Sequence, residues 1–438
     1  MKLNKQVVPA GYKNTDVGCI PSDWDVKKLR EISPSQSVGL VINPSSYYSE
    51  HGTVPMLTGS HVRPNRINYT QAKKITVDSN ARLPASRLNQ DDLVTVRVGA
   101  PGITAVIPPE LHQANCASMM IIRRSEKFNS DWLCYLMNSK QGRTQIESVQ
   151  YGTAQKQFNI VDAVDFIFPL PRIEEQTAIA NALSDVDALI SELEKLIAKK
   201  QAIKTATMQQ LLTGKKRLPQ FAKSEDGTPK GYKKSELGNT PEDWDIGSVG
   251  DRSVSYSGGT PSTSNKSFYG GNISWITSSD LNKSFIYEVE GRITEAGLQG
   301  SSAKLVDAGT FLIALYGATA GVCAITKIKA AINQAVLAVA SSLWSAEFLF
   351  YWFTNNKNKL IETYTQGGQP NLSGDIVRSI RMSIPPMREQ KEIVSVLSDM
   401  DDELQALEKR LKKTRQIKQG MMQELLTGKT RLVKPESK

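Results

Sequence analysis

Two long stretches of the chain carry apolar residues in alternating steps of four and three. This 3.5-residue period is typical of a coiled-coil seam and is narrower than the apolar stripe of a helix packed on a globular core. We expect two long helices, which begin just after Pro171 and Pro385 and end at Gly214 and Gly428. The seam positions are Ile179, Leu183, Val186, Ile190, Leu193 and Ile197 in the first helix, and Ile393, Leu397, Met400, Leu404, Leu407 and Leu411 in the second.

Each of these helices needs a partner for its seam, because an isolated helix of this kind is marginally stable in water. We expect an antiparallel pair within one chain; packing of each helix on its own domain, or pairing between two chains, are the alternatives. Towards the ends of the helices, Lys200, Lys204, Thr414 and Lys418 fall on projected seam positions. The seam there either loosens to receive another protein or is simply solvated.

Residues 30–165 and 250–380 alternate short β-like runs with turn signals and helical stretches. Residues 93–98 precede Gly99, and residues 311–315 precede Gly317 in the same way. This pattern predicts a mixed α/β (α+β) domain that occurs twice.

The chain contains an internal repeat. Gly11-Tyr12-Lys13 recurs as Gly231-Tyr232-Lys233, and residues 171–218 recur closely as residues 385–432. The repeat is too long for a solenoid and indicates a tandem duplication, which we expect to fold about a pseudo-twofold axis. Because the regions between the matching blocks have diverged, the two copies share a frame and carry different inserts.

These observations predict five segments. They are a first globular domain (1–170), a first helical spacer (171–218), a linker with a second globular domain (219–384), a second helical spacer (385–432) and a tail (433–438).

A length of 438 residues predicts two to four domains. The 54 Lys and Arg residues exceed the 44 Asp and Glu residues and give a net charge of +10, which favours a polyanionic partner such as nucleic acid. No apolar run is long enough to span a bilayer, and the N-terminus does not resemble a signal peptide. We therefore expect a cytoplasmic protein without a membrane anchor.

The sequence offers no motif for catalysis or metal binding. The four cysteines are far apart, and the three histidines all lie in the first quarter of the chain, so a zinc site and disulfides are not expected. Gly428-Lys429-Thr430 resembles the end of a phosphate-binding loop, but it follows a helix instead of preceding one. We expect no catalytic residue, no metal and no cofactor in this chain.

Polar loops in both globular domains carry Arg, Gln and Asn, which can read base edges with two hydrogen bonds. A solvated loop is the alternative for each residue. The candidates for DNA binding are Thr58, Ser60, His61, Arg63, Arg66, Thr153, Gln155, Lys156 and Gln157 in the first domain, and Ser278, Ser279, Lys283, Gln366, Gln369 and Asn371 in the second.

The repeated Gly-Tyr-Lys…Asp-Trp block and the helices that end in Leu-Leu-Thr-Gly-Lys resemble the specificity (S) subunit of Type I restriction–modification systems. The resemblance covers nearly the whole chain. It implies two target recognition domains joined by two helices in an antiparallel coiled coil. Each domain would read one half of a split, asymmetric DNA target, and the coiled coil would set the gap.

The resemblance also implies a subunit without catalytic activity of its own. Its partners would be double-stranded DNA, two methyltransferase subunits that use S-adenosylmethionine, and two restriction (helicase–nuclease) subunits that use ATP and Mg²⁺. The helical regions would form the surface that binds the methyltransferase subunits. The alternative is a standalone sequence-specific DNA-binding protein or a coiled-coil scaffold.

Overall fold

The structure is a computed structural model that describes residues 8–153, 155–364 and 371–434. The described residues form two compact units. The first unit draws on residues 1–194 and 410–438, and the second on residues 195–409. The first unit therefore combines segments from the two ends of the sequence.

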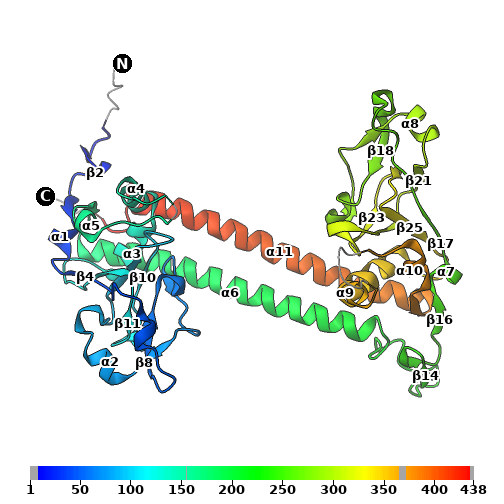
Figure 1. Ribbon diagram of the computed structural model, residues 1–438, viewed down its shortest axis with the longest axis horizontal. Helices are drawn as coiled ribbons and strands as arrows, with labels where there is room; N and C mark the ends of the chain where they lie inside the picture. Colours follow the sequence, from blue (N-terminus) through cyan, green and yellow to red (C-terminus); the bar gives the residue numbers. More distant parts are fainter. Residues whose placement is uncertain (1–7, 154, 365–370, 435–438) are drawn as a thin grey trace. The chain divides into compact units, whose positions relative to one another are not determined.

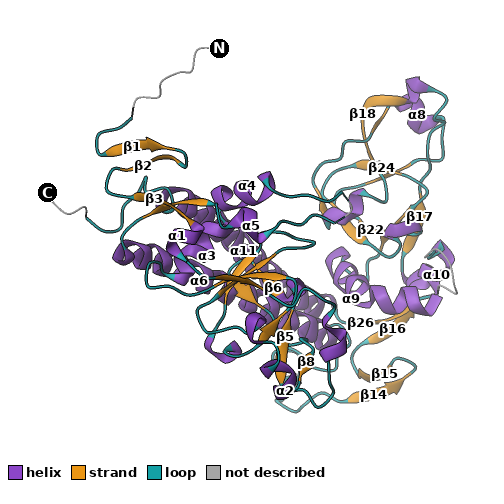
Figure 2. Ribbon diagram, turned by 60° about the vertical axis from the view of Figure 1, so that its left-hand side comes forward, coloured by secondary structure: helices purple, strands orange, loops and turns teal. Residues whose placement is uncertain are grey.

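The first unit contains a four-stranded antiparallel sheet in the order β10-β9-β12-β4 and a smaller sheet in the order β11-β5-β8. Figure 2 shows β5, β6 and β8 on one side of helices α3, α5 and α6. The strands are β1 (Tyr12–Thr15), β2 (Gly18–Pro21), β3 (Asp25–Lys28), β4 (Gln36–Val38), β5 (Val54–Leu57), β6 (Val62–Arg63), β7 (Arg66–Ile67), β8 (Lys74–Ile75), β9 (Leu93–Val96), β10 (Thr104–Val106), β11 (Asn115–Cys116), β12 (Met119–Ile122) and β13 (Ile167–Leu170). The helices are α1 (Leu29–Ile32), α2 (Val77–Ala81), α3 (Ser130–Asn138), α4 (Lys140–Ser148), α5 (Ile160–Ala163) and the first part of α6 (Ile173–Leu211).

The second unit contains a five-stranded sheet in the order β17-β25-β22-β23-β19 and a four-stranded sheet in the order β20-β18-β24-β21. Figure 1 shows β18, β21 and α8 at the end of this unit that lies away from α9 and α11. The strands are β14 (Tyr232–Ser235), β15 (Gly238–Pro241), β16 (Asp245–Ser248), β17 (Val254–Ser257), β18 (Tyr269–Ile276), β19 (Phe285–Ile286), β20 (Arg292–Ile293), β21 (Lys304–Val306), β22 (Phe311–Ala314), β23 (Cys323–Thr326), β24 (Ala330–Ile332), β25 (Val336–Ala340) and β26 (Arg381–Ile384). The helices are α7 (Val249–Arg252), α8 (Glu295–Gln299), α9 (Ala346–Tyr364), α10 (Gly374–Ser379) and the first part of α11 (Met387–Leu425).

The two units repeat one topology. The strand order β4-β12-β9-β10 of the first unit corresponds to β17-β25-β22-β23 of the second, and strands β9, β12, β22 and β23 are fully buried. In each unit a large apolar core contains residues of this sheet, of the start of one long helix and of the end of the other. The predicted mixed α/β class and the internal repeat are confirmed.

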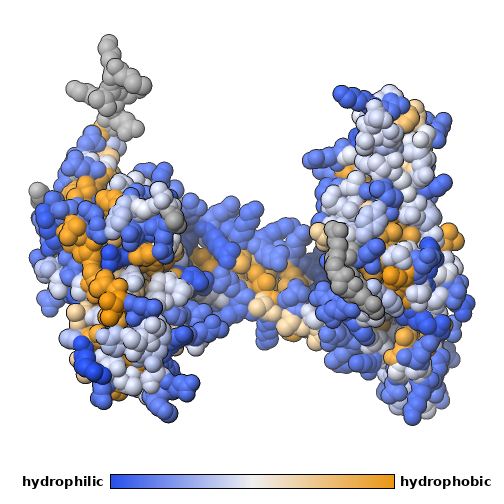
Figure 3. Space-filling view, viewed as in Figure 1, coloured by the Kyte–Doolittle hydropathy of each residue, from blue (hydrophilic) through white to orange (hydrophobic). Residues whose placement is uncertain are grey.

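Helices α6 and α11 are each 39 residues long. The start of α6 runs antiparallel to the end of α11 in the first unit, where Lys418 Nζ lies 2.6 Å from an Asp187 carboxylate oxygen. In the second unit the end of α6 pairs with the start of α11 in the same way, through Lys204 and Asp401. Hydrophilic residues dominate the face of these helices seen in Figure 3. The two predicted long helices and their antiparallel pairing are therefore confirmed.

Most of the predicted seam positions are withdrawn from solvent. Seven of the twelve are buried, and the rest are half-buried. The buried ones are Ile179, Leu183, Ile190, Leu193, Ile393, Leu397 and Leu404, and the half-buried ones are Val186, Ile197, Met400, Leu407 and Leu411.

A left-handed glycine follows each long helix. Gly214 has a φ of +70° and Gly428 a φ of +69°, a conformation that L side chains rarely adopt. A Cβ atom at Gly214 would lie 2.7 Å from the Pro241 ring, and one at Gly428 would lie 2.5 Å from the Pro21 ring. Both positions therefore require glycine for its conformation and for its small size.

Candidate nucleic-acid interface

A short turn after β5 holds three of the candidate residues of the first unit. The backbone N–H of Thr58 donates to Nδ1 of His61 at 2.9 Å. The hydroxyl groups of Thr58 and Ser60 lie 2.8 Å apart and face solvent. Arg63 donates to the carbonyl of Ser60 at 2.9 Å and leaves most of its guanidinium exposed.

The turn lies close to the end of β9. A Cβ atom at Gly59 would lie 2.9 Å from the side chain of Val96, so the turn packs directly on this strand. On the other side of the strand end, the N–H of Gly99 donates to the carbonyl of Lys156 at 3.1 Å. The loop that carries Thr153, Gln155, Lys156 and Gln157 therefore borders the same strand end as the turn. Of these four residues only Gln157 is half-buried, and the others are exposed.

The second unit repeats this arrangement. Ser278 and Ser279 lie in a turn after β18, next to the 3₁₀-helix Asp280–Lys283, which packs on β22 and β23. Asn371 forms a β-bridge with Tyr316, which follows β22, and Asn371 is exposed to solvent. The candidates Gln366 and Gln369 lie outside the described residues.

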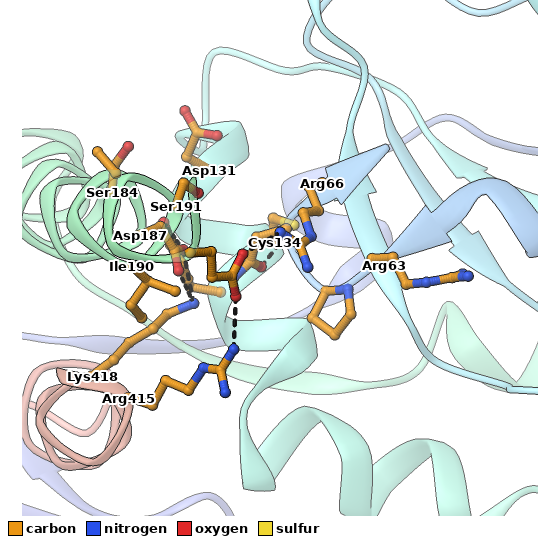
Figure 4. A pocket seen from close by; sticks show the side chains of 15 residues that line it. Arg63, Arg66, Asp131, Cys134, Ser184, Asp187, Ile190, Ser191, Arg415 and Lys418 are labelled. Carbon is orange, nitrogen blue, oxygen red and sulfur yellow. Dashed lines mark hydrogen bonds and ion pairs between the residues drawn. The ribbon is translucent and has the colours of Figure 1, made fainter. Parts of the chain in front are cut away.

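Arg66 is placed differently from the other candidates. Its guanidinium lies 3.5 Å from the carboxylate of Glu194 on α6, and Arg415 of α11 lies 2.7 Å from the same carboxylate. Together with Lys418 these residues line a pocket of about 540 Å³ in the first unit (Figure 4). Figure 4 shows Arg415 and Lys418 extending towards α6, whereas Arg63 points away from it. The contact of Arg66 therefore ties the β6–β7 hairpin to the helix pair.

The polar positions of the helix seam form matching clusters in the two units. The Tyr135 hydroxyl donates to Asp187 at 2.8 Å, and Lys418 pairs with the same carboxylate while lying 5.2 Å from the centre of the Tyr135 ring. Tyr351, Asp401 and Lys204 make the same set of contacts in the second unit. Burial and the neighbouring aspartate raise the pKa of both tyrosines, so both remain hydroxyl donors.

The remaining polar seam positions are also occupied within the chain. Lys200 pairs with Glu403 at 2.6 Å, and Thr414 is buried and donates to the carbonyl of Arg410. The lysines of the seam thus reach carboxylates on the opposite helix.

Two buried ionic clusters were not predicted from the sequence. Glu175 is 3% exposed and accepts hydrogen bonds from the Trp24 indole at 2.9 Å and from the Arg431 guanidinium at 2.5 and 2.8 Å. Arg431 also donates to both carboxylate oxygens of Asp23, at 2.9 and 2.8 Å, and it lowers the pKa of that carboxyl group. The first cluster therefore joins residues from both ends of the chain.

The second unit contains the equivalent cluster, made of Glu389, Trp244, Arg217 and Asp243. Glu175 and Glu389 lie in the first turns of α6 and α11, and both side chains are buried against a tryptophan and an arginine. Repetition of Asp-Trp, Glu-Gln and a late arginine at equivalent positions was the signal that could have revealed the clusters.

The described residues contain no group of His, Cys, Asp and Glu side chains that could hold a metal ion. Burial raises the pKa of the Cys116 thiol to about 12 and raises those of Cys134 and Cys323 as well, so these thiols stay protonated. Among the described residues, no helix has the length and apolar character needed to cross a membrane.

A known protein family matches each of the two repeats of the chain separately. The family model described as "Type I restriction modification DNA specificity domain" matches residues 21–205 and again residues 241–419, which together make up most of the chain. The chain belongs to this family. It is accordingly the DNA-recognition subunit of a Type I restriction–modification system and not an enzyme in its own right.

Relatives of this family match either nearly the whole chain or part of it. The putative Type I restriction enzyme MjaX specificity subunit of Methanocaldococcus jannaschii is 26% identical over 436 residues, which cover 96% of this chain and 97% of the relative. The EcoR124I/EcoR124II specificity subunit of Escherichia coli is 26% identical over 153 residues, 33% of this chain and 38% of that subunit.

Solved structures support the fold. The Type I system S subunit from M. genitalium has a TM-score of 0.55 at 14% identity and covers 92% of this chain, with 96% of its own length matched. A chain from a structure that describes the assembly and conformational transition of the Type I R-M system also has a TM-score of 0.55, at 16% identity, with 94% of this chain and 99% of that chain covered. The specificity family is therefore matched in sequence and in fold over both repeats.

Proposed function

We propose that each repeat of this specificity subunit reads one half of a split, asymmetric DNA target. The observation that carries the proposal is the double occurrence of one set of exposed polar loops at the same strand end of two matching sheets. Two readers with the same frame and different side chains are suited to two different half-sites on one duplex.

We further propose that residues 1–170 and 219–384 are the target recognition domains, and that the helical segments 171–218 and 385–432 act as spacers that set the gap between the half-sites. We assign the remaining residues, 433–438, to a tail. The Lys–Asp pairs of the two units support a common register for α6 and α11, because Asp187 pairs with Lys418 and Lys204 with Asp401. A paired helix of this kind is stiff enough to fix a distance.

The partners follow from the same assignment. The exposed surface of the helical segments is the docking site for two methyltransferase subunits, and the complete assembly also contains two restriction subunits. S-adenosylmethionine, ATP and Mg²⁺ belong to those subunits. The subunit acts in the cytoplasm, where its DNA target is found.

Domain exchange tests the assignment of the readers. Replacing residues 30–165 with the equivalent region of another specificity subunit should change one half of the methylated motif and leave the other half and the gap unchanged. The matched control replaces residues 250–380 and should change the other half. An unaltered motif after either exchange would contradict the assignment.

Shortening the helix pair tests the spacer. Removal of residues 196–202 together with the opposing residues 403–409 takes about two turns from both helices and preserves the heptad pattern. The pair becomes about 10 Å shorter, which corresponds to about three base pairs of DNA. The gap should shrink with both half-sites unchanged; new half-sites with the old gap would refute the spacer role.

A further inference from the structure

One turn occurs in both units with the same hydrogen bonds but with a different acceptor side chain. In the first unit it comprises Thr58, Gly59, Ser60 and His61, and in the second it comprises Thr277, Ser278, Ser279 and Asp280. Both turns follow a strand that pairs in parallel with a neighbouring strand, β5 with β11 and β18 with β24. The two turns are therefore equivalent in sequence order and in topology.

The contacts within the two turns match one by one. The N–H of Thr58 donates to His61 Nδ1 at 2.9 Å, and the N–H of Thr277 donates to Asp280 Oδ2 at 2.8 Å. The threonine hydroxyl lies 3.1 Å from the same acceptor in the first turn and 2.9 Å from it in the second. The side chain of the fourth residue therefore closes each turn by accepting from the first residue.

This closure positions an exposed pair of hydroxyl groups. Thr58 and Ser60 hydroxyl oxygens are 2.8 Å apart, and those of Thr277 and Ser279 are 2.9 Å apart. In each turn, the side chain three residues after the serine donates a hydrogen bond to the serine carbonyl. Arg63 does so at 2.9 Å in the first turn, and Asn282 at 3.0 Å in the second.

These two donor side chains differ in the bases they can read. Arginine pairs best with guanine, and asparagine with adenine. Each turn thus holds a common hydroxyl pair beside a side chain that differs between the units, Arg63 in one and Asn282 in the other.

We propose that His61 and Asp280 are matched positioning residues for the two DNA-reading turns, and that only the first turn is opened by acid. The proposal rests on the proposed function, because it assigns these turns to the two half-sites. His61 accepts a hydrogen bond at Nδ1 only as a neutral ring with its proton on Nε2. Protonation places a second donor opposite the Thr58 N–H and breaks that hydrogen bond, so the first turn loses one of its two contacts with His61. A carboxyl group, by contrast, retains a carbonyl acceptor even when it is protonated.

The surroundings of His61 favour its neutral form near pH 7. Burial of the ring and the charge of Arg63 hold the pKa of His61 below 6.5. The elements next to the turn carry two further arginines, Arg66 on β7, which pairs with the Glu194 carboxylate, and Arg97 after β9. The charge of Arg63 therefore opposes protonation of the ring, and opening of the turn requires a more acidic solution than an ordinary histidine would need.

Reciprocal substitutions test the pairing. The subunit is co-purified with its methyltransferase partner, and binding is measured at pH 5.5 and 7.5 with three duplexes: the intact target, one with the first half-site scrambled and one with the second scrambled. The ratio of dissociation constants between scrambled and intact DNA gives the discrimination at each half-site, and it cancels general effects of pH on binding.

For the unsubstituted subunit, discrimination at the first half-site should fall at pH 5.5, by up to about tenfold, and discrimination at the second should not change. His61→Asp should keep the discrimination and remove its pH dependence. Asp280→His should transfer the pH dependence to the second half-site. His61→Ala should lower discrimination about tenfold at the first half-site only, and Asp280→Ala should do the same at the second half-site only.

Three outcomes separate the possibilities. If the unsubstituted complex discriminates at both half-sites and all four variants discriminate as it does, His61 and Asp280 are not positioning residues. The proposed function would then remain intact. Absence of discrimination at any half-site in the unsubstituted complex would overturn the proposed function itself. If an alanine variant loses discrimination at both half-sites and also melts at a lower temperature, the substitution has damaged the fold. The conservative His61→Asp variant then tests the proposal, because it should discriminate normally at pH 7.5.

Discussion

Replacing Arg431 with methionine should destabilise the first unit selectively. The arginine donates two hydrogen bonds to Glu175 and two to Asp23, and its side chain is 17% exposed. Its removal leaves the carboxylate of Glu175, a buried residue, with the Trp24 indole as its remaining partner within the cluster. Loss of one member of a buried ion pair costs about 3–5 kcal/mol, and the partial exposure of Arg431 favours the lower value.

A loss of about 3 kcal/mol corresponds to a more than hundredfold increase in the opening of the first unit. Hydrogen exchange read by mass spectrometry resolves the two units and avoids the assumption of a single unfolding transition. Amides of β3, β13 and the start of α6 should exchange more than a hundredfold faster in Arg431→Met, whereas those of β16 and β26 should keep their rates. The matched variant Arg217→Met should show the reverse pattern, because Arg217 makes the same contacts with Glu389 and Asp243.

The double variant Arg431→Met/Glu175→Gln supplies the decisive control. Without a charge at position 175, removal of the arginine strands no buried carboxylate, so the double variant should be less damaged than Arg431→Met. Equal acceleration of exchange in both units, or no change in the first, would refute the reasoning that this cluster closes the first unit with residues from both ends of the chain.

Three further results follow from the same contacts. Arg431 holds the pKa of Asp23 below its ordinary value of 3.8, so the ionised carboxylate stabilises the first unit fully above pH 4. This stabilisation should vanish as the pH falls through the lowered pKa. In an acid titration, Arg431→Met should not show this loss, because it lacks the stabilisation. Tyr135→Phe removes a hydrogen bond to Asp187 and should cost the first unit about 1–3 kcal/mol in chemical denaturation, because the acceptor is charged. Gly428→Ala places a Cβ atom against Pro21 at a positive φ and should lower the thermal stability of the first unit, whereas an alanine at an exposed helical position should not.

The frame of this protein could be predicted from the sequence because it is repeated. The 4-3 spacing of Ile179 and Leu183 and of their copies Ile393 and Leu397 predicted two long helices, and all four side chains are buried. The short runs at 93–98 and 311–315 contain the central strands β9 and β22. Both signals are local, with a period of a few residues, so one sequence sufficed to find them.

The contacts that join distant segments could not be predicted in the same way. Arg431 meets Asp23 and Glu175 across 408 and 256 residues of sequence, and no periodic pattern records such a contact. Arg66 was expected at the DNA because it lies in a polar loop of the sequence, yet its guanidinium also contacts Glu194 of α6. Residue type and loop position cannot distinguish an arginine that faces DNA from one that contacts a neighbouring helix; the choice depends on which carboxylates the fold brings near.

The most direct test of the central claim is a map of methylated adenines in a host that lacks such systems. The chain is co-expressed with the methyltransferase subunit proposed as its partner, and a second culture expresses the methyltransferase alone. The account predicts one new split motif with a gap of constant length, found only in the first culture. Methylation without a split motif, or the same motif in both cultures, would contradict the claim that this chain reads the DNA.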